Sequence, residues 1–291
     1  MGRTSPNPSV GAVVARGGVI VGEGYHRRAG EPHAERIALA RAGQAARGAN
    51  VYVTLEPCCH HGRTPPCTDA LIDADVARVL YAVPDPDPRG AGGHAALDAA
   101  GIKVEAGLLA EHAERLLEGY IRHRRTGRPL LTLKLAMSLD GKIATHTGDS
   151  RWISGDASRR LVHAMRDHSD AVMVGVGTVL ADDPSLTTRL VEGRDAVRVI
   201  CDSRARTPAD ARVIAQDSPA ACVIAVGETA PEDRVETLEA AGAEVLRLPE
   251  RDGRVDLAPL MDALGERGML NVLMEGGGTL AWGALEAGVV D

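Results

Sequence analysis

The feature that most constrains the fold of this chain is a repeated alternation of short apolar runs with helix-like segments. Before residue 126, the strand-like runs are VGAVVARGGVIVGEGY, ANVYVTL, ARVLYAV and IKVEAG, and the helix-like segments between them are HAERIALARAGQAARG, TDALIDA and AALDAAG. Strands that alternate with helices form a sheet covered by helices on its faces. The pattern therefore predicts an α/β layered domain.

The alternation is interrupted once, at TGRP (residues 126–129), and then starts again. Residues 111–125 are predicted to form a basic amphipathic helix that this stretch terminates. We therefore expect two domains, residues 1–126 and 127–291. The second repeats the alternation from LLTLKLA to MLNVLME, which predicts another α/β unit with a mostly parallel sheet. Because the chain ends on AGVVD, an apolar run just begun, this domain is expected to be incomplete at its C-terminus.

Charge and apolar content exclude several classes of protein. A net charge of −7 disfavours binding along nucleic acid, which requires Lys and Arg to neutralise phosphates. The N-terminal MGRTSPNPSV lacks the apolar core of a secretory signal, and no apolar run approaches membrane-spanning length. We expect a cytoplasmic protein that binds neither nucleic acid nor membranes.

The five cysteines argue for a metal site rather than for disulfides. Their number is odd, and three of them lie within LEPCCHHGRTPPC, a pattern that disfavours a secreted disulfide framework. Cys201 and Cys222 lie in apolar strand-like runs and are expected to be buried core thiols.

A catalytic zinc ion needs three protein ligands and one open position for water. His33, Cys58 and Cys67 supply one imidazole and two thiolates. Glu35 can approach the same ion only if His33 stands at the very start of its helix, because positions i and i+2 of a regular helix face different sides. His33-Ala34-Glu35 and Pro57-Cys58 match the signature of zinc-dependent deaminases, in which the Glu transfers protons.

One part of the deaminase signature is not met, because Cys58 and Cys67 are nine residues apart. The longer loop carries hydrogen-bond donors, among them His60 and Arg63, that suit a phosphorylated or polyhydroxylated substrate. A structural zinc module is an alternative, with Cys59 or His60 filling the fourth position. A nucleoside or RNA-base deaminase is another, disfavoured by the acidic charge, the few aromatic residues and the second domain.

The stretches PNPSVGAVV, GYHRRAGEPHAE and VTLEPCCHHGRTPPC together resemble the deaminase half of the bifunctional deaminase/reductase family of riboflavin biosynthesis. The resemblance implies a cytidine-deaminase-like three-layer α/β/α domain. It also implies zinc on His33, Cys58 and Cys67, Glu35 as proton donor, and substrate contacts from Asn7, His26, His60 and Arg63. Asp85 and Asp87 stand where the family usually has an Asp-Pro-Asn-Pro loop, and we leave both out of the predicted site.

The second half contains an apolar strand-like run interrupted by Lys134, a charge that is costly to bury unless it is paired or used. Its turns GVGT and EGGGT precede helix-like segments and can hold a phosphate with backbone N–H groups. There is no GxGxxG, so a standard Rossmann dinucleotide site is excluded.

These stretches resemble the reductase half of the same family, which has a dihydrofolate-reductase-like α/β fold and uses NADPH. The resemblance implies that the cofactor contacts Ala136, Trp152, Thr178, Asp182, Gly277, Gly278, Thr279 and Gly283. It implies that the substrate contacts Ser150, Arg166, Leu186, Arg189 and Glu275. Lys134 is a candidate for polarising the reacting group.

The expected function follows from both halves. We expect zinc-dependent hydrolytic deamination of 2,5-diamino-6-(5-phosphoribosylamino)pyrimidin-4-one, and then NADPH-dependent reduction of its ribosyl side chain to ribityl. A homo-oligomer is expected. A deaminase with a non-functional reductase domain is the alternative that the C-terminus leaves open.

Overall fold

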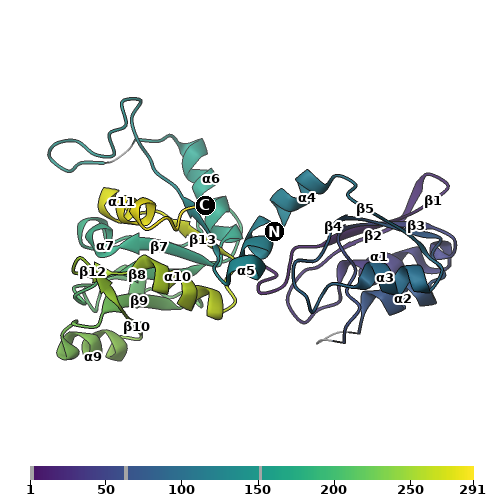
Figure 1. Cartoon of the computed structure of the whole chain (residues 1–291). Coiled ribbons are helices and arrows are strands. Elements are labelled where there is room, and N and C mark those ends of the chain that lie inside the picture. The colour runs from purple at the N-terminus through teal and green to yellow at the C-terminus, as the bar shows by residue number, and fades with distance from the viewer. Residues whose placement is uncertain (1–2, 62–64, 151–152) are drawn as a thin grey trace. The chain divides into compact units, whose positions relative to one another are not determined.

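The computed structural model describes residues 3–61, 65–150 and 153–291 (Figure 1). The described chain divides into two compact units, Arg3–Gly127 and Arg128–Asp291. Each unit has its own main sheet and shares no hydrophobic core with the other, so each is described by itself.

The first unit is built on a five-stranded sheet of order β2-β1-β3-β4-β5. The strands are β1 (Gly11–Arg16), β2 (Val19–Tyr25), β3 (Asn50–Leu55), β4 (Arg78–Val83) and β5 (Lys103–Ala106). β1 runs antiparallel to β2 and β3, whereas β3, β4 and β5 are parallel to one another. The carboxyl ends of β3 and β4 therefore meet at one edge of the sheet, which is where ligands bind in α/β folds.

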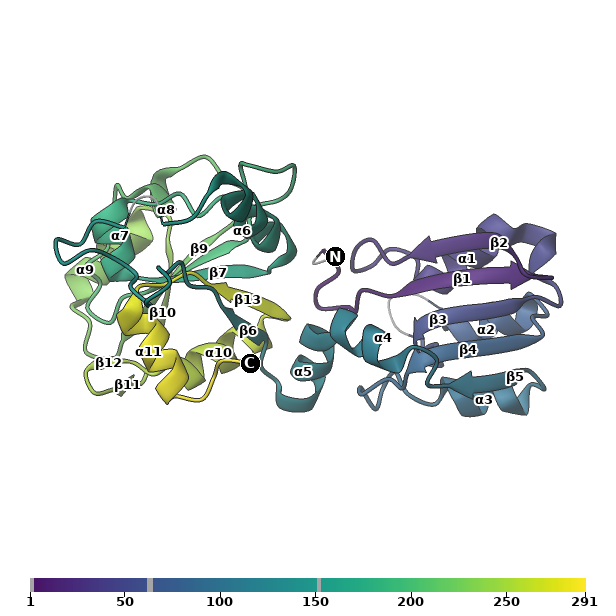
Figure 2. The ribbon, with the colours of Figure 1, turned by 90° about the horizontal axis from the view of Figure 1, so that it is seen from above.

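Helices cover this sheet on one face and partly on the other (Figure 2). One face carries α1 (Ala34–Ala42), the short 3₁₀ helix η1 (Gly43–Ala46), α2 (Cys67–Asp73) and α3 (Gly93–Ala99). The core between them contains Val14, Leu39, Val51, Leu71 and Leu97. α4 (Ala110–Leu116) lies over the opposite face and is followed by α5 (Glu118–Thr126). The three-layer α/β/α arrangement is confirmed.

Two glycines of β2 set the position of α1. A Cβ on Gly24 would lie 2.5 Å from the backbone O of Ala34 and 2.7 Å from the N of Ala38, and one on Gly22 would lie 2.2 Å from the O of Ala38. No side chain fits at these distances, so the helix backbone packs directly on the strand. This close approach fixes where α1 begins.

The second unit is built on a six-stranded sheet of order β10-β9-β8-β7-β13-β6, in which every pairing is parallel. The strands are β6 (Leu130–Leu133), β7 (Ala171–Gly175), β8 (Val197–Cys201), β9 (Cys222–Gly227), β10 (Glu244–Leu248) and β13 (Asn271–Met274). The mostly parallel sheet is confirmed.

Alternate residues of these strands enter two different cores. Val172, Ile200 and Ile224 pack beneath α7 (Val176–Asp182), α8 (Arg212–Ala215) and α9 (Glu232–Ala240). Met173, Val199 and Val223 pack against α10 (Leu257–Glu266) and α11 (Gly278–Glu286). Figure 2 shows α6 (Asp156–His168) on the same side as α8 and α9.

Four local predictions were wrong or incomplete. The helix predicted over residues 111–125 is two helices, because Leu117 breaks it with φ −102° and ψ 8° and is itself buried. The strand expected to run through Lys134 ends at Leu133, so Lys134 is only half-buried beyond the sheet. The small hairpin β11 (Glu250–Arg251) and β12 (Arg254–Val255) was not predicted. Cys222 is buried as expected, but Cys201 is only half-buried.

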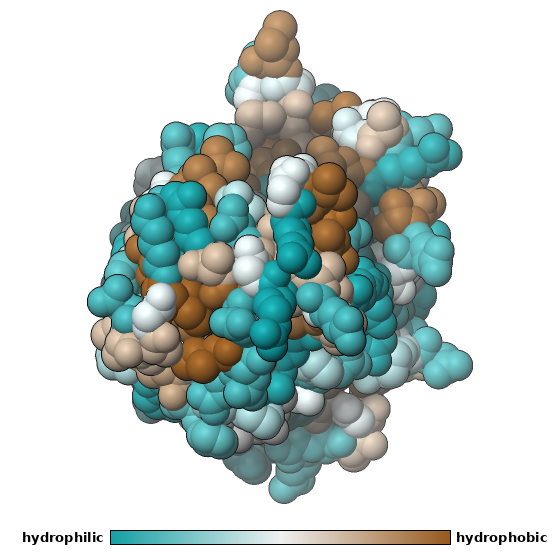
Figure 3. All heavy atoms as spheres, turned by 90° about the vertical axis from the view of Figure 1, so that its right-hand side faces the viewer, coloured by the Kyte–Doolittle hydropathy of each residue, from teal (hydrophilic) through white to brown (hydrophobic). Residues whose placement is uncertain are grey.

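Among the described residues, no helix is both long and apolar enough to cross a bilayer. On the face in Figure 3, hydrophilic residues dominate and hydrophobic residues form separate patches. Such a mixture is ordinary for the surface of a folded domain with apolar cores.

Candidate active sites

His33 lies directly before α1 and is its N-cap residue, with φ −70° and ψ 161°. Because this backbone is not helical, the side chain of His33 points in a direction that a residue inside the helix could not adopt. Glu35, in the first turn of α1, can therefore face the same cavity as His33. The sequence-based condition for their convergence is met.

Cys58 follows β3, and Cys67 is the first residue of α2. The backbone N–H of Cys67 donates to Sγ of Cys58 at 3.4 Å and also to the carbonyl oxygen of Cys58 at 3.1 Å. These bonds draw the two ends of the intervening loop together. A separation of nine residues in the sequence thus becomes direct contact in space.

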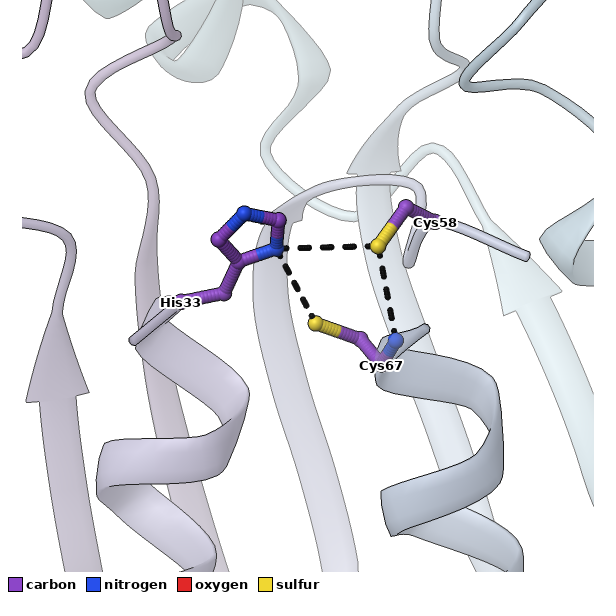
Figure 4. Close-up of side chains that lie close together, drawn as sticks. All are labelled: His33, Cys58 and Cys67. Atoms are coloured by element: carbon purple, nitrogen blue, oxygen red, sulfur yellow. Dashed lines mark hydrogen bonds between the residues drawn. The ribbon is translucent and has the colours of Figure 1, made fainter. Parts of the chain in front are cut away.

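The three side chains converge on one point (Figure 4). Nδ1 of His33 lies 3.3 Å from Sγ of Cys67 and 3.6 Å from Sγ of Cys58, and the three atoms lie within 4.8 Å of one another. In a tetrahedral zinc site with bonds of about 2.0–2.3 Å, such atoms are separated by about 3.6 Å. The donor set and its spacing fit zinc.

The charges of these groups depend on one another. Hydrogen bonds from the Cys67 thiol and from His33 lower the pKa of Cys58 to about 4, even though burial acts in the opposite direction. The hydrogen bond with Cys58 also raises the pKa of His33. The site therefore stabilises a thiolate, the form of cysteine that binds metals.

Glu35 is 4% exposed, and burial raises the pKa of its carboxyl above the usual value. It lines the same cavity as His33 and Cys58 but does not belong to the trio of converging ligand atoms. A buried carboxyl beside a metal site is suited to proton transfer.

The cavity has a volume of about 440 Å³, and it brings together most of the residues predicted for the first site. Asn7, His26 and His60 line it, whereas Arg63 lies outside the described residues. Nδ1 of His26 lies 3.2 Å from the carbonyl oxygen of Pro32, so it carries the proton. Nε2 of His26 then accepts from the side-chain amide of Asn7 at 3.1 Å, which orients Asn7 in the cavity.

Residues that were not predicted also line this cavity, notably Asp85, Asp87, Arg89, Tyr120 and Arg124. The Tyr120 hydroxyl donates to Asp85 at 2.9 Å, and Asp87 pairs with Arg89 at 3.0 Å. These two aspartates, which were left out of the predicted site, follow β4, whose carboxyl end adjoins that of β3, and this is why they line the cavity. The sequence contained this signal, since consecutive parallel strands end at one edge.

Glu56, also unpredicted, holds the segment that carries Cys58. Its buried carboxylate accepts N–H groups from Asp85 at 3.2 Å, Gly92 at 3.1 Å and His94 at 2.9 Å. A Cβ on Gly93 would lie 1.8 Å from the carbonyl oxygen of Pro57, so the start of α3 packs directly against this segment. Backbone groups thus fix the ligand loop from two sides.

In the second unit, four of the residues predicted to contact substrate come from α6, the segment after α7 and the end of β13. Arg166 makes two hydrogen bonds to Glu275, at 2.6 and 3.0 Å, and a third to the carbonyl oxygen of Thr187 at 2.9 Å. Leu186 is buried next to this network with φ +56°. Arg189 follows Leu186 by three residues and is exposed. Ser150 is exposed, on the long segment between β6 and α6.

His163, one turn before Arg166 on α6, was not predicted. Its Nδ1 accepts the backbone N–H of Arg189 at 3.0 Å. Burial, and then the charges of Arg166 and Arg189, lower the pKa of His163 to about 4. A neutral imidazole therefore fixes the backbone of Arg189.

Several of the residues predicted to contact NADPH follow the carboxyl ends of the parallel strands β7 and β13. Thr178 follows β7 and adjoins the glycine turn after β13, since a Cβ on Gly277 would lie 3.9 Å from its Oγ1. Gly278 opens α11 beside Ile143, and Thr279 and Gly283 of α11 line a cavity of about 490 Å³. Asp182 ends α7, Ala136 is half-buried, and Trp152 lies outside the described residues.

The fold and the sites define a two-unit enzyme that combines a zinc deaminase with a nucleotide-dependent α/β reductase. Residues 1–83 match the family model of the cytidine and deoxycytidylate deaminase zinc-binding region, and residues 129–291 match that of the RibD C-terminal domain. The chain belongs to the RibD family, the bifunctional deaminase/reductases of riboflavin biosynthesis, which use zinc and NADPH.

Individual relatives agree with this assignment. The riboflavin biosynthesis protein RibD of Escherichia coli K12 is 45% identical over 99% of this chain and 80% of its own length. The riboflavin biosynthesis protein RibD of Actinobacillus pleuropneumoniae is 44% identical over 100% of this chain and 77% of its own length. The solved structure of Acinetobacter baumannii RibD, form 2, superposes with a TM-score of 0.87 at 38% identity, covering 99% of this chain and 79% of that one.

A Thermotoga maritima structure superposes equally well, with a TM-score of 0.87 at 40% identity over 98% of this chain and 79% of that chain. That protein is described as a diaminohydroxyphosphoribosylaminopyrimidine deaminase and 5-amino-6-(5-phosphoribosylamino)uracil reductase.

Proposed function

We propose that Arg3–Gly127 carries the deaminase and Arg128–Asp291 the reductase, acting in turn on the phosphoribosylaminopyrimidines named for the Thermotoga maritima relative. One observation carries the proposal. The imidazole of His33 and the thiols of Cys58 and Cys67 converge beside a cavity that also contains the buried Glu35. A small heterocyclic substrate with a sugar phosphate is compatible in size with a cavity of about 440 Å³.

In the deaminase, His33, Cys58 and Cys67 hold zinc, which supplies Lewis-acid activation of a water molecule. The carboxylate of Glu35 takes a proton from the attacking water and delivers it to the departing amine. Asn7, oriented by His26, contacts the pyrimidine ring, and His60 and Arg63 contact the sugar phosphate. Asp85 and Asp87 form the wall of the cavity that follows β4.

In the reductase, NADPH supplies the hydride, and the chain positions the two reactants. Arg189 binds the phosphate of the substrate, because its guanidinium is exposed, whereas that of Arg166 is already engaged by Glu275 and Thr187. Ser150, Arg166, Leu186 and Glu275 complete the substrate site. Lys134, directly after β6, polarises the group that is reduced.

The cofactor lies along Ala136, Trp152, Thr178 and Asp182 and along the start of α11. On that helix and its preceding turn, Gly277, Gly278, Thr279 and Gly283 receive its phosphates and the adjoining sugar. Backbone N–H groups at a helix N-terminus favour such a negatively charged ligand.

The test is mass spectrometry of the diaminopyrimidine substrate after incubation with the zinc-loaded chain, with and without NADPH. We expect loss of the amino group without cofactor and reduction only when NADPH is present. Deamination of cytidine instead would replace the substrate assignment with a nucleoside. A chain that holds zinc and converts neither compound would refute the proposal.

The variant Glu35→Gln separates catalysis from metal binding. We expect a loss of deamination of at least 10²-fold, the usual contribution of a positioned acid–base group, with one zinc retained. Reduction of the deaminated compound should be unchanged, which serves as the control. Normal deamination by this variant would show that Glu35 does not transfer the proton.

We also propose that the protein is a cytoplasmic homo-oligomer. Support for the oligomer comes from a groove of about 570 Å³ on the sheet face that α4 covers in part, lined among others by Tyr25, Leu109 and Leu116. These three apolar side chains are exposed. Light scattering of the purified chain gives the mass of the assembly.

A further inference from the structure

The wall of the first-unit cavity includes a cation that comes from the last turn of α5. Tyr120 and Arg124 lie one turn apart on this helix, and both line the cavity. The guanidinium of Arg124 lies over the Tyr120 ring, 5.0 Å from its centre, and only 20% of the side chain is exposed. A cation in this position needs polar partners, because burying an unpaired charge is costly.

One partner of Arg124 is the carboxylate of Asp87, on the loop that follows β4. Its Oδ2 lies 3.5 Å from Nε of Arg124 and also accepts a hydrogen bond from Nη2 of Arg89 at 3.0 Å. Nε of Arg124 is buried and has no hydrogen bond in the part of the chain that the structure describes. The ion pair with Asp87 therefore compensates for this burial, and it is screened less by water and salt than a pair on the open surface.

The second partner of Arg124 is the N-terminal turn that carries Asn7. Nη2 of Arg124 donates to the carbonyl oxygen of Pro6 at 3.2 Å. That carbonyl belongs to the planar peptide group that joins Pro6 to Asn7. The N–H of Asn7 donates in turn to the carbonyl oxygen of Thr4 at 2.8 Å, which closes the turn around Pro6. The contact with Arg124 thus fixes the backbone of Asn7.

Asn7 depends on such contacts because it lies outside the sheet. β1 begins four residues later, at Gly11, so Asn7 is not held by strand pairing. Its side-chain amide donates to Nε2 of His26 at 3.1 Å, which sets the direction of the amide but not the place of the backbone. Arg124 supplies this second constraint, and through Asp87 it ties the turn to the loop after β4.

We propose that Arg124 is a positioning residue of the deaminase. It bridges the carbonyl oxygen of Pro6 to the carboxylate of Asp87, and so sets where Asn7 meets the pyrimidine ring of the substrate. The planar guanidinium suits this task, because its Nε and Nη2 face two different acceptors in fixed directions. This inference rests on the proposed function of the first unit, in which Asn7 contacts the ring.

The test is the steady-state kinetics of ammonia release from the diaminopyrimidine substrate by the full zinc-loaded chain. The variants are Arg124→Gln and Asp87→Asn, and each is also made in a chain that carries Asn7→Ala. The control is Arg125→Gln, which removes the next arginine of α5, an exposed residue outside this cavity. Zinc content and thermal unfolding are measured for every variant.

We expect Arg124→Gln to raise KM by about tenfold or more, the usual effect of losing a hydrogen bond from a charged group, and to retain zinc. The value of kcat should be unchanged, because Asn7 binds the ring alike before and during the reaction. Asp87→Asn keeps the shape of the side chain but removes its charge, so it should raise KM in the same direction. Arg125→Gln should change neither constant.

The chain with Asn7→Ala gives the decisive comparison. If Arg124 acts through Asn7, Arg124→Gln should cause no further rise in KM once Asn7 is absent, whereas a general structural role would raise KM equally in both backgrounds. Equal rises, an unchanged KM in either single variant, or loss of zinc or of folding from Arg124→Gln would overturn the inference. An unaltered chain that does not deaminate the substrate would instead refute the proposed function, and the inference would fail with it.

Discussion

Cys58 and Cys59 are neighbours in the sequence, but their side chains have different partners. Cys58 Sγ contacts His33 and the N–H of Cys67, whereas the Cys59 thiol donates to the carbonyl oxygen of Ala91 at 3.2 Å. Only one of the pair therefore faces the metal site. This answers the alternative in which Cys59 is a fourth ligand, since its thiol is directed to the segment before α3.

The two thiols provide a matched pair of variants. We expect Cys58→Ser to lose zinc on dialysis against a weak chelator, because a hydroxyl is a much poorer zinc ligand than a thiolate. Cys59→Ser should retain one zinc per chain and its deaminase activity. Elemental analysis of the dialysed proteins is the measurement, and equal zinc contents in the two variants would contradict the assignment.

His163 makes the stability of the second unit depend on pH. Burial and the charges of Arg166 and Arg189 lower its pKa from 6.5 to about 4 in the folded state. As the pH falls from about 6.5 to 4, the unfolded chain takes up a proton that the folded chain does not. The stability contribution of this group is thus fully present above about pH 6.5 and is lost progressively as the pH falls toward 4.

The check on this prediction is denaturant unfolding of the unaltered chain and of His163→Gln between pH 7 and 5. The variant should show a smaller decrease in the free energy of unfolding over that range. The same slope in both proteins would mean that His163 is not the group responsible.

For individual residues, the sequence predicted those that belong to short recognisable motifs. It missed those that reach the cavity only through tertiary packing. His33, Glu35, Cys58 and Cys67 lie in two short motifs with recognisable chemistry. Tyr120 and Arg124 enter the same cavity from α5, and nothing in their local sequence marks them. Their contribution depends on tertiary packing, which spacing along the chain does not report.

Among the elements, the contact between β2 and α1 has the most direct effect on the metal site. Gly24→Ala places a methyl group where the backbone of α1 lies, so we expect a loss of about 1–3 kcal/mol and a weakened zinc site. Gly11→Ala is the control, since a Cβ there would be 4.0 Å from its nearest neighbour. Thermal unfolding and zinc content should change for the first variant only.

The elements themselves were largely predictable, because apolar runs of strand length are separated by helical segments in both units. The exceptions have physical causes. The run of helical residues from Glu111 to Arg125 contains no glycine break until Gly119, yet the chain turns at Leu117, whose side chain is buried. The two-residue strands β11 and β12 are too short to show any periodicity.

On the scale of the whole molecule, two units that share no hydrophobic core predict two separable unfolding events. We expect calorimetry to show one transition that a zinc chelator lowers and another that NADPH raises. NADPH at 100 times its dissociation constant should raise its transition by about 5–10 °C. The variant Cys58→Ser should lose the response to the chelator and keep the response to NADPH. A single transition that shifts with both the chelator and NADPH would show that the two units unfold together.

The order of strands in the second sheet has a consequence for how the chain acquires its structure. Within the part of the chain that the structure describes, β6 pairs with β13 alone, which lies about 140 residues further along, whereas the first sheet is complete once β5 has been made. At usual rates of synthesis, on the order of ten to thirty seconds separate these two points on the ribosome. During that interval the apolar segment Leu130–Leu133 lacks the strand with which it pairs in the folded protein. The nascent chain then has a folded first unit followed by a strand with unpaired backbone N–H and C=O groups. We therefore expect this segment to be open to pairing with other strand edges until residue 274 has emerged.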